Sequence, residues 1–323
     1  MKSKFIYLFI ACSLAIFLTI SACKQLLITP DEVGSEPVRN FELFWNDVNK
    51  TYPFFADDNV DWQAVYDKYR PLVTVTTSTE NLFGIFVKMM EPLIDGHRSL
   101  SYEDYYWNND AKYRGNAKYN FQLIKNKYLQ NFSIKTQPDY FDPKKIDTAL
   151  ILGKTIGGNY AYLGVRTFYT DYDIADLVGN YLEANPQTKG IILDLRNNGG
   201  GRLGSIWGLM SLFADYDVPY ATYQPKVGPL KNNLMPLDLL TEPDFVIPRG
   251  GQFANKKIVL ITNRLCYSST EHAALAAKRM GFPIVGDTTG GALSLVVEKT
   301  LPNGIKYVQI GRASCRERVC STV

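Results

Sequence analysis

Histidine and cysteine are scarce in this chain of 323 residues, which has two histidines and five cysteines. The histidines are His97 and His272, too few to build a typical zinc site with one plausible thiol, so we expect no metal. Four of the cysteines lie near the ends of the chain, namely Cys12, Cys23, Cys315 and Cys320. Because only Cys266 remains in the body of the chain, we expect no intramolecular disulfide and a fold that depends on its hydrophobic core.

A strong excess of one charge sign is also absent, since 35 Lys and Arg face 32 Asp and Glu for a formal net charge of +3. Residues 1–22 and 310–323 together account for four net positive charges, which leaves the body of the chain at −1. A nearly neutral body provides no electrostatic basis for binding nucleic acid. The sequence also lacks Gly-x-Gly-x-x-Gly and Gly-Lys-Ser/Thr motifs, which disfavours nucleotide binding, and we expect no cofactor.

The apolar run from Phe5 to Ile20 is too short for a spanning helix and follows two lysines, as in a secretory signal. The Ser-Ala-Cys sequence that ends at Cys23 resembles a bacterial lipoprotein cleavage box. This resemblance implies a signal peptide over 1–22, a lipidated Cys23 and a tether over 23–38, with the protein anchored in the cell envelope outside the cytoplasm. The alternative is an ordinary signal peptide with an incidental cysteine.

Residues 310–323 change composition abruptly and resemble the translation of a sequencing adapter. We therefore expect a non-native tail here and exclude it from predictions of the fold. The alternative is a genuine basic tail.

Apolar residues recur at helical spacing in three successive segments, over 41–48, 62–69 and 82–93. This spacing predicts a small bundle of three amphipathic helices over 39–100, with the aromatic residues in its core. Residues 101–148 are rich in Tyr, Asn, Asp and Lys and show little periodicity. We expect short strands and loops there, linking the bundle to a larger domain over 149–309.

Apolar strands alternate with helical patterns from residue 149 onward. The expected strands are 160–165, 190–195, 257–262 and 283–285. The expected helices are 174–182, 203–213 and 270–280. This alternation predicts a mostly parallel sheet with covered faces. A β-hairpin is expected over 293–309, with its turn at Pro302-Asn303-Gly304.

Two segments where a strand ends and a helix begins could support acyl-transfer chemistry. The first, 194–201, ends in Gly199, Gly200 and Gly201, whose backbone N–H groups could bind negative charge. The second, 267–271, contains Ser268, which could act as a nucleophile with the Ser269 N–H and a glycine N–H as the oxyanion hole. The alternative is that Ser268 and the glutamate three residues later form a capping box.

These two segments and Gly286-Asp287-Thr288-Thr289-Gly290-Gly291 resemble the core of the tail-specific, or C-terminal processing, serine peptidases. The resemblance extends over residues 40–309. It implies an α/β crotonase-like (ClpP/crotonase) catalytic core beside the N-terminal three-helix subdomain. It also implies that Ser268 is the nucleophile.

Within that family, the serine/lysine branch carries Gly-Lys where this chain has Gly291-Ala292. The Asp95-Gly96-His97 segment instead resembles the histidine segment of the tricorn-like branch, which implies His97 as the base and a glutamate at or beyond Gln309. His272, one helical turn after Ser268, is the alternative base. A purely structural His97 at a helix end is the alternative role for that residue. We expect Glu271 to cap its helix and Cys266 to pack.

The favoured function is therefore an envelope-anchored serine endopeptidase that hydrolyses extended peptides or unfolded proteins. A non-catalytic binding protein for apolar or peptide ligands is the alternative, because the same fold also serves as a carrier. Acyl chemistry on a thioester is a third possibility, but no Lys/Arg cluster near the glycines supports binding of a coenzyme's phosphates.

Overall fold

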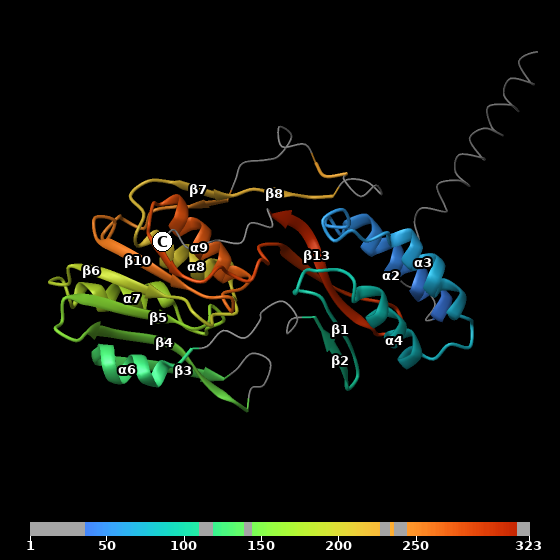
Figure 1. The fold of residues 1–323 in the computed structure, drawn as a ribbon, viewed down its shortest axis with the longest axis horizontal. Helices are drawn as coiled ribbons and strands as arrows, with labels where there is room; N and C mark the ends of the chain where they lie inside the picture. Colours follow the sequence, from blue (N-terminus) through green and yellow to red (C-terminus); the bar gives the residue numbers. More distant parts are fainter. Residues whose placement is uncertain (1–35, 110–118, 139–143, 227–232, 236–243, 315–323) are drawn as a thin grey trace, which may run out of the picture.

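A computed structural model describes residues 36–109, 119–138, 144–226, 233–235 and 244–314. The predictions for the signal peptide, for Cys23 and for most of the tether lie outside these residues, as does the expected non-native tail from residue 315. Figure 1 shows two halves, a helical one that contains α2 to α4 and an α/β one that contains α6 to α9. The candidate site residues come from both halves.

The N-terminal half begins with three amphipathic helices, which confirms the predicted bundle. They are α2 (Pro37–Thr51), α3 (Trp62–Tyr69) and α4 (Thr79–Met90), with a 3-10 turn, η2 (Arg70–Leu72), after α3. Asp61 and Ser78 accept hydrogen bonds from backbone N–H groups in the first turns of α3 and α4, so both helices start at a capping side chain. The apolar faces share one core, in which Phe44 and Phe86 stack with ring centroids 4.1 Å apart.

A sheet in the order β12-β13-β1-β2 packs on this bundle. Its strands are β1 (Ser99–Tyr102), β2 (Tyr105–Asn108), β12 (Leu295–Thr300) and β13 (Lys306–Ser314), and all their pairings are antiparallel. The predicted hairpin therefore forms, but Leu301, Ile305 and Tyr307 are buried in the core of the helical bundle. The prediction that residues 149–309 share one core was therefore wrong for the hairpin, which packs with the N-terminal helices.

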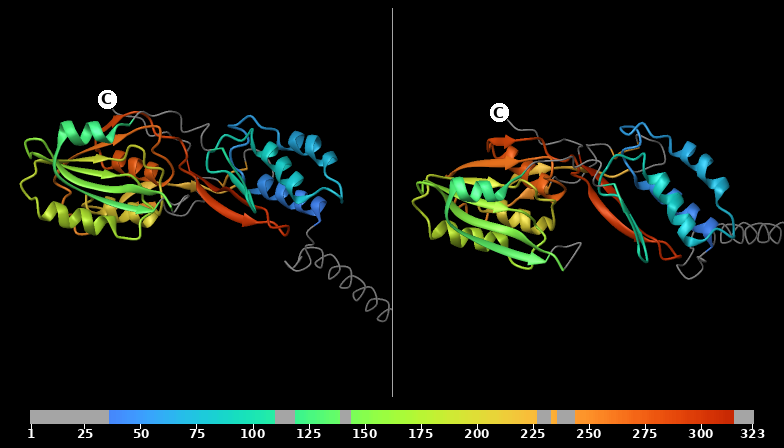
Figure 2. Two further views of the ribbon diagram at one scale, coloured as in Figure 1. Left: turned by 90° about the horizontal axis from the view of Figure 1, so that it is seen from below. Right: turned by 60° about the horizontal axis from the view of Figure 1, so that its bottom comes forward.

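Strand β13 continues past the predicted end at Gln309. Ile310 is buried in the bundle core, and Ala313 and Ser314 pair with β8 (Tyr223–Gln224). The segment excluded from residue 310 onward thus contributes strand structure through Ser314. Figures 1 and 2 show β13 running from the helical half toward the α/β half.

The α/β half is built on a six-stranded sheet in the order β11-β10-β6-β5-β4-β3. Its strands are β3 (Leu129–Pro138), β4 (Ile146–Thr155), β5 (Tyr160–Val165), β6 (Gly190–Asp194), β10 (Lys257–Thr262) and β11 (Ile284–Gly286). Strands β5, β6, β10 and β11 are parallel to one another, as predicted, while β4 and β3 are antiparallel additions. The linking segment 101–148 therefore supplies the outer strand of this sheet.

Helices cover both faces of the sheet (Figure 2). One face packs on α7 (Ile174–Glu183), α8 (Leu203–Ser211) and α9 (Ser269–Arg279), and the other packs on α6 (Phe121–Tyr128). Successive side chains of a strand point to opposite faces of the sheet. In β6, Ile191 and Leu193 therefore point into the larger core, and Ile192 packs on the α6 side. A small pair, β7 (Val218–Ala221) and β9 (Asp244–Val246), contacts α9 and α8.

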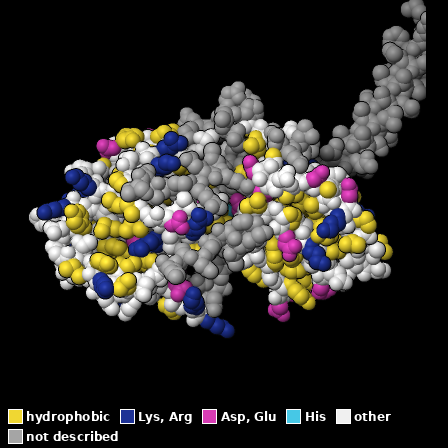
Figure 3. All heavy atoms as spheres, in the orientation of Figure 1, with side chains coloured by type: hydrophobic (Ala, Val, Ile, Leu, Met, Phe, Trp, Pro, Cys, Tyr) yellow, Lys and Arg dark blue, Asp and Glu magenta, His cyan; other side chains and the backbone are white. Residues whose placement is uncertain are grey.

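Among the described residues, no helix combines the length and hydrophobicity that crossing a membrane requires. On the face drawn in Figure 3, basic and acidic side chains are interspersed over both halves.

Candidate active site

Ser268 lies on the turn between β10 and α9, at the residue just before the helix. Its backbone has φ 54° and ψ −126°, and residues other than glycine rarely adopt a positive φ. The Ser268 side chain makes no capping hydrogen bond to its helix. A serine held in such a conformation at a strand-to-helix turn presents its hydroxyl outward, as nucleophilic serines require.

The predicted capping box does not form. Glu271 is fully buried, and its two carboxylate oxygens accept the N–H groups of Gly291 and Ala292, each at 2.6 Å. The expectation that Glu271 caps α9 was therefore wrong, because the carboxylate points to the segment after β11 and not to the start of its own helix. Burial raises the pKa of Glu271, although hydrogen bonds from Thr289, Ala292 and Gly291 and the charge of His97 oppose that rise.

The glycine loop lies directly against Ser268. A side-chain carbon at Gly200 would lie 2.9 Å from the Cβ of Ser268 and 3.1 Å from the nitrogen of Ser269, and Gly200 has φ +108°. Only glycine fits there. The Gly200 N–H donates to the side-chain oxygen of Asn198 at 2.9 Å and is thus engaged, contrary to its predicted place in the oxyanion hole.

The other predicted oxyanion groups differ from Gly200. Within the described part of the chain, the N–H groups of Gly199, Gly201 and Ser269 donate to no acceptor. The Ser269 hydroxyl donates to the Gly201 carbonyl and ties the start of α9 to the glycine loop. Three of the four predicted backbone donors therefore remain open near Ser268.

His97 comes from the other half of the molecule, just before β1. Its ring lies 5.0 Å from the ring of Tyr267, centroid to centroid, and Tyr267 directly precedes Ser268. The Nδ1 atom of His97 lies 3.1 Å from Oδ1 of Asp95, and the same oxygen accepts the backbone N–H of His97 at 2.9 Å. The Nε2 atom is buried and has no hydrogen-bond partner among the described residues.

Asp95 is buried, and the sequence analysis named it within the histidine segment without giving it a role. Burial opposes its ionisation, but the charge and hydrogen bonds of His97 and the charge of Arg98 outweigh burial and lower the pKa of the Asp95 carboxyl. The Arg98 guanidinium also donates to the Asp95 carbonyl at 2.6 Å. The Asp-Gly-His spacing was visible in the sequence, and a carboxylate two residues before a histidine was the available signal.

His272 is engaged at both ring nitrogens. Nδ1 lies 3.1 Å from the Tyr223 hydroxyl and Nε2 lies 3.1 Å from the Leu293 carbonyl. Burial lowers the pKa of His272 to about 4, so the ring is neutral near pH 7. Cys266 is a buried free thiol that contacts the Leu195 carbonyl at 3.0 Å, and burial raises its pKa to about 12, as suits a packing residue.

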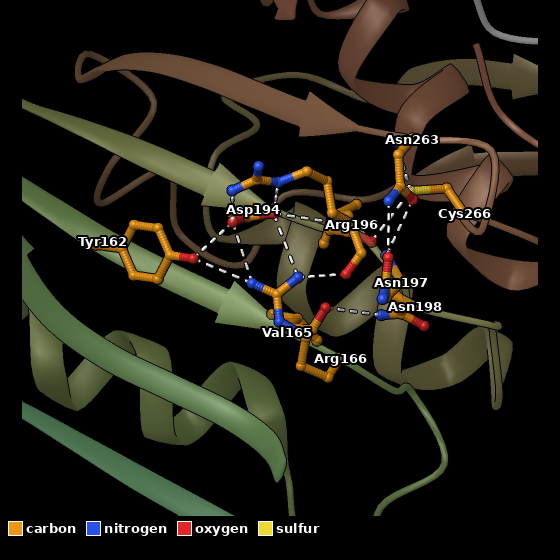
Figure 4. Close-up of polar contacts among 10 residues, drawn as sticks. Tyr162, Val165, Arg166, Asp194, Arg196, Asn197, Asn198, Asn263 and Cys266 are labelled. Carbon is orange, nitrogen blue, oxygen red and sulfur yellow. Dashed lines mark hydrogen bonds and ion pairs between the residues drawn. The ribbon is translucent and has the colours of Figure 1, made fainter. Parts of the chain in front are cut away.

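Asp194 organises the base of the glycine loop (Figure 4). Its carboxylate accepts hydrogen bonds from Tyr162 at 2.6 Å and from Arg196 at 2.6 and 3.0 Å, and it pairs with Arg166 at 3.1 Å. Arg166 also donates to the Arg196 carbonyl. Burial opposes ionisation of Asp194, but the two guanidinium groups prevail and lower its pKa to about 2.

No group of three or more His, Cys, Asp or Glu side chains in the described ranges is arranged to hold a metal ion. What the site does contain is a strained, uncapped serine, a histidine oriented by a carboxylate and open backbone N–H donors. This combination defines the class of serine hydrolases.

The comparisons with known proteins identify the family. Residues 159–314 match the model of Peptidase family S41, and residues 35–91 match that of the Tricorn protease C1 domain. The chain therefore carries an S41 serine-type peptidase domain over 159–314, which confirms the resemblance found in the sequence. No curated protein matches the chain.

Solved structures share the fold. A candidate peptidase from Parabacteroides merdae ATCC 43184 is 24% identical, with a TM-score of 0.70 over 87% of this chain and 84% of that one. The photosystem II D1 C-terminal processing protease is 14% identical, with a TM-score of 0.54 over 89% and 92% of the two chains. A lipoprotein from Streptococcus agalactiae is 15% identical, with a TM-score of 0.53 over 89% and 91%. The expected crotonase-like α/β fold is thereby confirmed.

Proposed function

We propose that this peptidase cleaves peptide bonds with Ser268 as the nucleophile and His97 as the general base. The main support is the contact between His97 and Tyr267, which brings the histidine of one half of the molecule to the serine turn of the other. The unpartnered Nε2 of His97 and the uncapped Ser268 leave both groups available for catalysis, and catalytic hydrogen bonds often tighten only when substrate binds. His272 is a poorer base because both its nitrogens are engaged.

In this proposal Asp95 accepts the Nδ1 proton of His97, which leaves Nε2 able to take a proton. Nε2 removes the Ser268 hydroxyl proton as Oγ attacks the peptide carbonyl. The N–H groups of Ser269 and Gly199 stabilise the resulting oxyanion. The imidazolium then protonates the leaving amine, and a water molecule activated by the same nitrogen hydrolyses the acyl-enzyme.

The substrate class follows from the family, and we propose extended peptides or unfolded proteins. The test is labelling with a fluorophosphonate, followed by location of the label and by assay of peptide cleavage. Labelling should occur at Ser268 and be lost in Ser268→Ala. Ser133→Ala, which removes an exposed serine on β3, is the matched control and should label normally. A label on another residue, or cleavage that survives Ser268→Ala, would contradict the assignment.

We also propose that Cys23 carries a lipid anchor that holds the protein at a bacterial membrane outside the cytoplasm. The support is the Ser-Ala-Cys sequence after a short apolar run and the fold shared with a lipoprotein of Streptococcus agalactiae. Metabolic labelling with a fatty acid should mark the wild-type chain and fail to mark Cys23→Ser. Equal labelling of both chains would exclude this cysteine as the anchor.

A further inference from the structure

Glu271 is a fully buried carboxylate for which the proposed reaction has no use. It lies three residues after Ser268 and has no role at the start of its own helix. Its two oxygens instead hold the successive N–H groups of Gly291 and Ala292 at 2.6 Å each. Such a pair of short bonds to a carboxylate is strong and needs both oxygens in place.

The segment that Glu271 holds presses on Tyr267. A side-chain carbon at Gly290 would lie 2.4 Å from the Tyr267 ring, so the backbone there is in direct contact with it. The Gly290 N–H donates to the Cys266 carbonyl at 2.8 Å, which keeps the segment beside the serine turn. Tyr267 in turn packs against His97. A continuous path of contacts therefore leads from Glu271 to His97.

We propose that Glu271 is a positioning residue of the peptidase site, which holds segment 290–292 against Tyr267 and thereby sets where the His97 ring lies. This inference rests on the proposed function, since it gives the position of His97 a catalytic consequence. Displacing a catalytic group by about 1 Å can reduce the rate about 100-fold.

The test compares two variants. Glu271→Gln keeps the size of the side chain and removes its charge, whereas Glu271→Asp keeps the charge on a shorter side chain that lies farther from Gly291 and Ala292. Glu298→Gln on the exposed face of β12 is the matched control. The whole chain contains two histidines, so histidine-selective NMR labelling gives two sets of ring signals, and a His272→Gln variant identifies those of His97. Peptide cleavage, phosphonate labelling and circular dichroism are measured on the same samples.

We expect Glu271→Gln to move the His97 ring signals and to lower kcat about 10- to 100-fold, with KM within about twofold. Glu271→Asp should fall between this variant and wild type, and Glu298→Gln should match wild type. Unmoved His97 signals in folded Glu271→Gln would overturn the proposal. If the glutamine variant does not fold, unmoved His97 signals in folded Glu271→Asp would overturn it instead. If wild type cleaves nothing but Glu271→Gln moves the His97 signals, the proposed function fails while the positioning role stands.

Discussion

Two polar clusters lie at the carboxyl ends of the paired strands β6 and β10, and they use their polar groups in opposite ways. At the end of β6, Asp194 is saturated by Tyr162 and two arginines. After β10, Ser268 has a strained backbone and no capping bond, and the nearby His97 has an unpartnered Nε2. A saturated cluster stabilises a fold, whereas a cluster with open groups is available for chemistry.

If this contrast is correct, damage to the open cluster should abolish activity and spare the fold. We expect Asp95→Asn and His97→Gln each to lower kcat about 1,000- to 10,000-fold, because the imidazole loses its orientation or is absent. Both variants should remain folded, although Asp95→Asn should lose some stability because the folded chain favours the ionised form of this buried carboxyl. Asp104→Asn, in the exposed turn between β1 and β2, is the matched control. An Asp95→Asn enzyme with wild-type kcat would exclude Asp95 from the site.

Damage to the saturated cluster should have the reverse effect. Asp194→Asn leaves the buried guanidinium of Arg166 without its counterion, and breaking a buried pair in this way costs about 3 to 5 kcal/mol. Urea unfolding should show that loss. The fraction that stays folded should keep the His97 ring signals of wild type. A variant as stable as wild type would remove the basis of the comparison.

The stability of the fold should depend on pH through three buried groups, His272, Asp194 and Glu271. Burial lowers the pKa of His272 from its ordinary 6.5 to about 4, so between these values the unfolded chain binds more protons and stability falls as the pH falls. The loss from this residue is about 3 kcal/mol. Asp194, with its pKa lowered from 3.8 to about 2, extends the loss below pH 4. Glu271, whose pKa is raised by burial, acts in the opposite direction.

Urea unfolding from pH 8 to pH 3 measures this dependence, and His272→Gln isolates the histidine's share. The difference in stability between wild type and this variant should shrink as the pH falls from 6.5 to 4. A difference that stays constant over that range would mean that His272 is not buried in its neutral form.

Much of the fold was predictable because burial leaves a simple pattern in the sequence. The apolar runs at 160–165 and 257–262 became β5 and β10 with the expected bounds. Helix α6 was missed, and β3 was expected only as one of several unplaced short strands, since most β3 side chains are exposed and a polar outer strand shows no clear periodicity. The packing of the 293–309 hairpin on the helical bundle depends on contacts between distant segments, which local patterns do not report.

The site divides in the same way. Ser268 and His97 could be singled out from short motifs, since their chemistry requires particular residue types. The roles of Glu271 and Gly200 depended on the path of the backbone. Ser268 to Glu271 fits a capping box in sequence, and only the position of Gly291 beside the carboxylate reveals a different partner. Likewise, the side chain of Asn198 engages the Gly200 N–H, a contact that glycine content does not predict.

The smallest expected effect concerns the strain at Ser268. Because a residue with a side chain is held at φ 54° there, glycine should fit the turn more easily, and Ser268→Gly should raise the free energy of unfolding by roughly 1 kcal/mol while it abolishes cleavage. Ser268→Ala, which keeps a side-chain carbon, should abolish cleavage without this gain. Urea unfolding of both variants measures the difference. A glycine variant no more stable than the alanine variant would mean that the serine turn stores no strain, and the contrast with the Asp194 cluster would then depend on hydrogen bonding alone.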